Sequence, residues 1–194
     1  KPKLRNTLYE VWLNGLLSAP TTHLANMIGN TITRLVTPLE KGVAATLEVG
    51  RAMITRTPRE RFFGEVSADL YGTVAGLKDG VRRGLKAYRT EGLGEGLVKV
   101  EHLPAIRVKT GELVRTPTRL LTAEDVFFKA IAESAELQTL AYRTAIQEGH
   151  RGAARVTRIA ELLANPTDQM YAAMKQAGEY QTFTNRLGKM GRSL

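Results

Sequence analysis

The sequence contains no cysteine. This excludes a disulfide framework, a thiolate nucleophile and any zinc or iron-sulfur site that cysteine would hold. Only three histidines are present, His23, His102 and His150, and they lie too far apart to form a local metal-binding motif. We therefore expect neither a metal ion nor another cofactor. The lack of cysteine suits a reducing compartment and equally a particle that persists outside a cell.

Recognisable catalytic motifs are also missing. The sequence has no P-loop, no dinucleotide-binding glycine fingerprint, no His-Glu-x-x-His and no Gly-x-Ser-x-Gly. Glu124 and Asp125 could be paired acids, but neighbouring helical residues point about 100° apart. Their spacing after Thr122 favours a capping box at the start of a helix instead. We expect no enzymatic activity from this chain.

A third absence is charge between Val11 and Thr33, where no Asp, Glu, Lys or Arg occurs, although the whole chain has a formal net charge of +9. The run is long enough to span a bilayer, which takes about 20 residues. Its three asparagines, its histidine and its proline argue against an ordinary transmembrane helix, because each polar group would need a partner at membrane depth.

Pro20 predicts a break in this run, with Ser18 as the N-cap of a second helix. Pro38 similarly predicts the start of a third helix that ends near Thr57. The first two helices each have an apolar face, which we expect to be buried at a helical corner. These faces comprise Leu8, Val11, Trp12 and Leu16, then Leu24, Met27, Ile28, Ile32 and Leu35.

The longest regular element expected in the first half runs from Arg59 to Gly92. Its apolar stripe consists of Phe63, Val66, Leu70, Val74, Leu77, Val81, Leu85 and Tyr88. This spacing repeats every 11 residues, which keeps a nearly straight helix facing one partner. We expect an apolar partner to cover the stripe. Its central part, Leu70, Val74, Leu77 and Val81, is called the apolar seam below.

Small residues recur at every fourth position of the same element: Gly64, Ala68, Gly72, Gly76, Gly80 and Gly84. Each glycine inside a helix costs about 1 kcal/mol relative to alanine, so close backbone approach must offset the cost. We predict that Gly72, Gly76, Gly80 and Gly84 form a contact ridge for tight helix packing next to the apolar seam.

Two other interpretations of this element stay open. It could lie on a bilayer as an amphipathic helix, with Lys78, Arg82, Arg83 and Lys86 as candidate contacts to phosphate or lipid. Alternatively, the glycines could break the helix.

The second half begins with a connector, 91–116, which includes a small hairpin or extended excursion around Thr110 and Gly111. It divides an N-terminal helical lobe, 1–90, from a C-terminal helical lobe, 117–194. The second lobe is expected to contain a central buried helix from Thr122 to about Gly149, followed by two shorter helices separated at Asn165-Pro166. The predicted fold class is all-α, a bundle-like arrangement of several helices with one long amphipathic helix.

Two segments resemble a known family. LNGLLSAPTTHLANMIGNT, Leu13 to Thr31, and RTPTRLLTAEDVFFKAI, Arg115 to Ile131, are similar to two patterns that follow each other in a helical region of large polyvalent phage proteins and internal virion proteins. The resemblance implies a piece of a much longer chain, which the initial Lys1 also suggests. It further implies a location inside the virion, packing with other virion proteins or copies of itself, and ejection with the DNA towards the host envelope, where a membrane surface is a further expected partner.

The charge balance leaves another class of function open. With 28 Lys and Arg against 19 Asp and Glu, the chain would attract DNA non-specifically and in a salt-dependent way. A basic nucleic-acid-binding helical module is therefore one alternative, although the positive residues are dispersed and no nucleic-acid-binding motif occurs. The other is a helical scaffold within a larger phage-borne enzyme, whose chemistry would lie outside these residues.

Overall fold

The computed structural model describes residues 2–90 and 115–182, and this part of the chain forms six α-helices and no strand. The helices are α1 (Pro2–Leu17), α2 (Pro20–Thr55), α3 (Gly64–Thr90), α5 (Thr116–Gln147), α6 (Gly152–Ala164) and α7 (Asp168–Gln181). The predicted all-helical class is confirmed. The predicted hairpin lies outside the described residues, except for its final two, which lead into α5.

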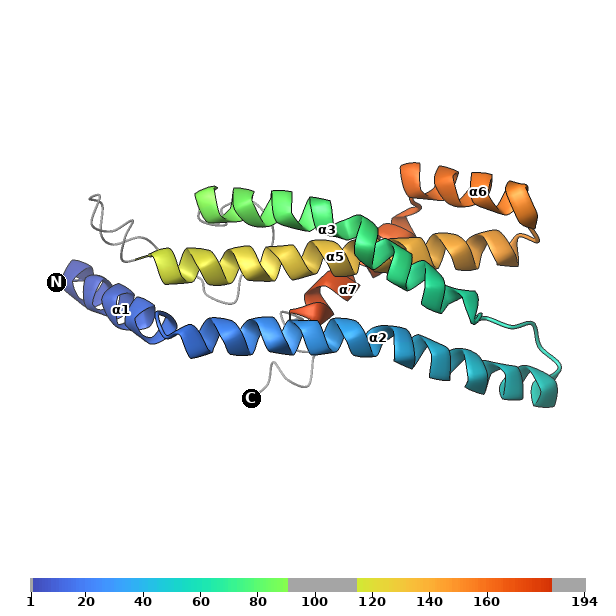
Figure 1. Ribbon diagram of the computed structural model, residues 1–194, viewed down its shortest axis with the longest axis horizontal. Coiled ribbons are helices and arrows are strands. Elements are labelled where there is room, and N and C mark those ends of the chain that lie inside the picture. Colours follow the sequence, from blue (N-terminus) through green and yellow to red (C-terminus); the bar gives the residue numbers. More distant parts are fainter. Residues whose placement is uncertain (1, 91–114, 183–194) are drawn as a thin grey trace.

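Helix α5 lies at the centre of an elongated bundle (Figure 1). It packs along α3 and also contacts α1, α2, α6 and α7. This confirms the expected central helix. Because α3 comes from the predicted N-terminal lobe and α5 from the predicted C-terminal lobe, the two halves of the sequence are packed against each other.

Helices α1 and α2 meet at the predicted break. Pro20 begins α2, where its missing N–H is not needed. The N-cap is Ala19 and makes no side-chain cap, so the prediction of Ser18 as N-cap is wrong. The Ser18 hydroxyl instead donates to the carbonyl of Gly15 over 2.7 Å, at the end of α1.

Pro38 does not start a third helix, because α2 continues through it to Thr55. Proline costs one helical hydrogen bond at this point. Tertiary contacts on both sides of Pro38 stabilise the continuous helix, because Arg34 and Lys41 both bind the buried carboxylate of Asp69 on α3. Tertiary contacts thus override a local stop signal.

The capping box predicted at Thr122 is also wrong, because α5 begins six residues earlier, at Thr116. Pro117 stands in the first turn, a favoured place for proline. Glu124 and Asp125 are therefore inside the helix and free to serve tertiary contacts. The two shorter helices at the end are confirmed, and the Thr167 hydroxyl caps α7 by accepting from the Met170 amide over 3.2 Å.

Candidate functional site: a polar interior beneath an apolar face

The predicted glycine ridge (Gly72, Gly76, Gly80 and Gly84) is buried against α5 of the same chain. A Cβ added at Gly72 would lie 2.7 Å from the Cα of Ala135, and one added at Gly80 would lie 3.0 Å from the carbonyl oxygen of Phe127. At Gly72 the two backbones therefore approach too closely for a side chain, and at Gly80 a Cβ would require the neighbouring atoms to shift. Helix α3 is continuous along the ridge, so the interpretation of the glycines as helix breakers is wrong.

The apolar seam points away from α5. Leu70, Val74, Leu77 and Val81 are 50%, 68%, 44% and 51% exposed. Together with the glycines, the buried face of α3 includes Glu65 and Asp69. The expectation of an apolar cover is therefore not met by the described residues. Glycines and acids face inward on α3, and aliphatic side chains face outward.

Helices α1 and α2 repeat this inverted pattern. The predicted burial of their apolar faces is wrong, since Leu8, Trp12, Leu24 and Leu35 are exposed. Polar side chains of the same helices are buried in their place: Glu10, Asn14, Asn30, Arg34, Lys41 and Glu48. The reason lies in the partner surface, because α3 and α5 offer these helices carboxylates and hydroxyls to pair with.

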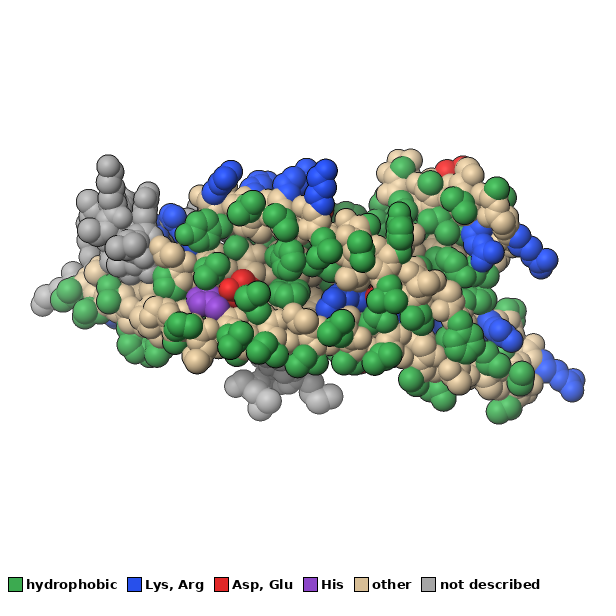
Figure 2. Space-filling view, viewed as in Figure 1, with side chains coloured by type: hydrophobic (Ala, Val, Ile, Leu, Met, Phe, Trp, Pro, Cys, Tyr) green, Lys and Arg blue, Asp and Glu red, His purple; other side chains and the backbone are tan. Residues whose placement is uncertain are grey.

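The exposed apolar side chains gather on one part of the molecule. Among the described residues, nearly all of the exposed large apolar side chains belong to α1, α2 or α3, or to Phe63 directly before α3. The exceptions are Leu120, Val156, Tyr171 and Tyr180. Figure 2 shows apolar side chains over α1, α2 and α3 on one face. We call this surface the outer face. None of the described helices is long and apolar enough to cross a membrane.

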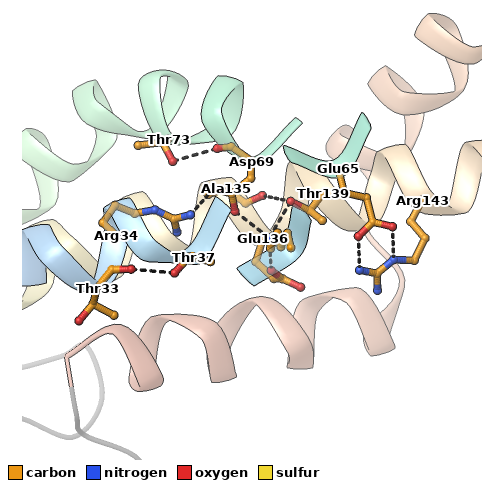
Figure 3. A network of polar contacts seen from close by, with 11 residues as sticks. Thr33, Arg34, Thr37, Glu65, Asp69, Thr73, Ala135, Glu136, Thr139 and Arg143 are labelled. Carbon is orange, nitrogen blue, oxygen red and sulfur yellow. Dashed lines mark hydrogen bonds and ion pairs between the residues drawn. The ribbon is translucent and has the colours of Figure 1, made fainter. Parts of the chain in front are cut away.

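Asp69 is the centre of the polar interior and is fully buried (Figure 3). It accepts hydrogen bonds from the Arg34 guanidinium and, over 2.7 Å, from Lys41 Nζ. Lys41 Nζ also lies 2.8 Å from a Glu136 carboxylate oxygen and 2.8 Å from the Thr139 hydroxyl. One buried cluster therefore joins α2, α3 and α5.

A second pair joins α3 and α5. The Arg143 guanidinium donates twice to the Glu65 carboxylate, over 3.0 and 2.7 Å. These bonds raise the pKa of Arg143 above its usual value, so the arginine stays charged.

Glu133 of α5 makes a third cluster, between α3 and α7. It accepts from Arg83 and Lys175, each over 2.9 Å. Arg83, predicted as a phosphate or lipid contact, thus pairs with a carboxylate of its own chain. The other predicted contacts, Lys78, Arg82 and Lys86, are exposed on α3.

The two segments that carry the family resemblance meet in space. His23 Nδ1 lies 3.0 Å from Glu124 Oε1, and the Asn26 amide donates to Glu124 over 3.0 Å and to Asp125 over 3.2 Å. At the other end of the segments, Thr118 donates to the side chain of Asn14. Sequence reasoning missed these contacts because it assigned Glu124 and Asp125 to a helix cap.

A groove between α2, α5 and α7 is lined by Arg34, Glu40, Glu136, Gln176 and Tyr180, among others. Its charged side chains include those of the ion-pair network around Asp69. Within the described ranges, no three His, Asp or Glu side chains are placed to hold a metal ion.

Comparison of the chain with protein-family models, with curated proteins and with solved structures found no match.

Proposed function

We propose that this chain is a non-catalytic, architectural segment of a phage internal virion protein. It packs with other segments of a longer chain or with other copies inside the particle, and it is ejected with the genome to help DNA delivery. The observation that carries the packing role is the outer face. Exposed apolar surface on this scale is typical of a surface that binds something apolar.

The inward polar contacts support a structural role for the rest of the chain. Buried ion pairs are a poor source of net stability, but they penalise wrong pairings strongly, because a misplaced charge is left unpaired. The contacts of Asp69, Glu65 and Glu133 therefore fix how α2, α3, α5 and α7 fit together. This leaves the apolar sides of α1, α2 and α3 to face other molecules.

The resemblance supplies the phage context, and the structure is compatible with it. His23 and Asn26 of the first segment contact Glu124 and Asp125 of the second. The two segments thus act as parts of one structural unit, which gives a physical reason for their occurrence together.

The nucleic-acid alternative predicts DNA binding that weakens steeply with salt. Several cations are engaged by carboxylates of the chain, among them Arg34, Lys41, Arg83, Arg115 and Arg143. A protein-packing segment should instead associate through the outer face, with little dependence on salt.

Mass spectrometry of purified phage particles tests the proposed function. Peptides of the chain should be present in full virions and depleted from the empty shells that remain after DNA release. Retention in the shells would replace ejection with a fixed structural role. Absence from both samples would overturn the virion proposal and favour the enzyme-scaffold or DNA-binding alternatives.

A further inference from the structure

We infer that the outer face of α1, α2 and α3 binds in the plane of an anionic lipid bilayer surface. The inference rests on the proposed function in taking the outer face as the binding surface, and it names the partner that this face meets after ejection, when it is no longer packed against other segments or copies inside the particle. It follows from three features of the described residues: the side chains that face outward, the positions of the exposed charges, and the lack of a helix that could span a membrane.

The outward side chains are mainly aliphatic. On α2 they include Leu24, Ile28, Ile32, Leu35, Leu39, Val43 and Leu47, which are between 49% and 70% exposed. Cores of protein–protein interfaces are enriched in aromatic residues, Met and Arg. A predominantly aliphatic surface matches hydrocarbon better than it matches such an interface.

Charge is sparse on the same surface of α1 and α2 from Val11 to Glu40, although Arg5 near the start of α1 is exposed. Between Val11 and Glu40 the only Asp, Glu, Lys or Arg residues are Arg34 and Glu40, and Arg34 is buried against Asp69. A polar interior combined with an apolar exterior is the arrangement expected where the surroundings are less polar than water. The 36 residues of α2 extend about 54 Å at 1.5 Å per residue.

Exposed positive charge borders the apolar surface. Lys78, Arg82, Lys86 and Arg89 are exposed on α3, and Arg82 pairs with Asp79. The other two carboxylates of α3, Glu65 and Asp69, are buried. Figure 2 shows basic side chains along the α3 edge of the face.

For a chain outside the particle, this charge distribution favours anionic lipid over a second copy. A second copy would bring the same positive row to the interface, whereas anionic headgroups complement it.

The geometry favours lying on the bilayer over crossing it. None of the described helices can span a membrane, and few large apolar side chains are exposed on α5, α6 and α7. An amphipathic surface with apolar residues on one side and cations at its border inserts to the depth of the headgroup and acyl-chain boundary. Helices α5 to α7 would then remain on the aqueous side.

The single tryptophan of the chain, Trp12, reports binding directly. It is 59% exposed on α1. The purified chain is mixed with vesicles of phosphatidylcholine alone or with added phosphatidylglycerol. We expect the emission of Trp12 to shift to shorter wavelength with the anionic vesicles, and lipids brominated on their acyl chains should quench it.

Two pairs of variants separate the apolar and electrostatic contributions. Val74→Glu with Val81→Glu should weaken vesicle binding at least about tenfold, because two exposed apolar side chains become charged. Lys78→Gln with Arg89→Gln should weaken binding to anionic vesicles by about fivefold per cation. Ala160→Glu with Ala172→Glu adds the same negative charge at exposed positions of α6 and α7 and should have a much smaller effect.

Circular dichroism establishes that each variant is folded, and sedimentation velocity without lipid gives its oligomeric state. The inference is overturned if the folded chain binds neither vesicle, if the control pair weakens binding as much as the Val74 and Val81 pair, or if copies associate through this face and exclude lipid. Failure of vesicle binding would leave the presence of the chain in virions untouched. Conversely, absence from virions would leave a positive vesicle result standing.

Discussion

Single residues carry the contact between α3 and α5. The glycine ridge allows the α3 backbone to lie against the α5 backbone, and the Ser134 hydroxyl donates to the carbonyl of Gly72 over 2.8 Å across that contact. The energetic cost of glycine in a helix is therefore offset by close packing at these positions. Gly29 and Gly50 of α2 have nothing within 4 Å of the position that a Cβ would take, so they should respond to substitution oppositely to the glycine ridge.

Gly72→Ala should destabilise the fold by about 1–3 kcal/mol, the usual range for overpacking. The new Cβ would lie 2.7 Å from the Ala135 backbone, so the helices must separate. Gly50→Ala is the matched control, because nothing lies within 4 Å of its Cβ position on α2. It should stabilise by up to about 1 kcal/mol. Urea unfolding measures both, and equal effects would contradict the close-packing explanation.

Asp69→Asn should cost about 3–5 kcal/mol, because it leaves the positive charges of Arg34 and Lys41 without their shared buried carboxylate. Asp79→Asn provides the comparison on the same helix. Asp79 pairs with Arg82 and Arg83 near the surface, so its loss should change the free energy of unfolding by less than about 1 kcal/mol. A small effect at Asp69 would mean that the buried cluster contributes little to stability.

At the scale of elements, the sequence was informative about helices and misleading about their faces. Apolar periodicity located α3 and the central α5, and Pro20 located the corner between α1 and α2. The stop at Pro38 failed because α2 is held on both sides of it by Arg34 and Lys41. Apolar periodicity and the positions of proline are features of the local sequence, and they indicate where a helix can form.

The inward face of α2 could not be predicted in the same way. His23, Asn26, Asn30, Arg34 and Lys41 recur at helical spacing, and this is the signal that could have revealed the polar interior. Periodicity shows that a helix has two different faces. The choice of which face is buried depends on the partner helix, and the carboxylates that pair with this stripe lie about 28 to 101 residues away.

The end of α2 is held to the following connection by Glu48. Its carboxylate accepts from the Arg51 side chain over 2.8 Å and from the Glu60 amide over 2.7 Å. These bonds, that from Arg51 first, lower the pKa of Glu48 from 4.5 to about 2. A lowered carboxyl pKa means that the contribution to stability is complete above the ordinary pKa and disappears as the pH falls through about 2.

Glu48→Gln should therefore lower stability at pH 7, and the difference from the original chain should narrow below pH 4.5 and vanish near pH 2. Carboxyl ¹³C NMR should give a titration midpoint of about 2 for Glu48. Glu40→Gln, at an exposed position of the same helix, should leave stability unchanged across this range. A Glu48 midpoint near 4.5 would show that the bonds to Arg51 and Glu60 are not formed in solution.

For the whole molecule, the inverted distribution of polarity makes an unusual prediction about charged substitutions. Leu39 and Leu47 of α2 are 68% and 70% exposed. Leu39→Glu with Leu47→Glu should therefore change the free energy of unfolding by less than about 1 kcal/mol, since little buried apolar area is lost. In most folded chains, two charges introduced into the long apolar stripe of a helix would be strongly destabilising.

The same pair should reduce the binding of a hydrophobic dye such as ANS, while circular dichroism stays the same. Leu121→Glu is the opposing test. Leu121 is 7% exposed on α5, so a carboxylate at this position would be buried away from water without a partner. That single substitution should unfold the chain or cost several kcal/mol, about 3 or more. If the α2 pair unfolds the protein as Leu121→Glu does, the apolar stripe of α2 faces the core in solution. The polar interior, the outer face and the lipid surface inferred for it would then all have to be abandoned together.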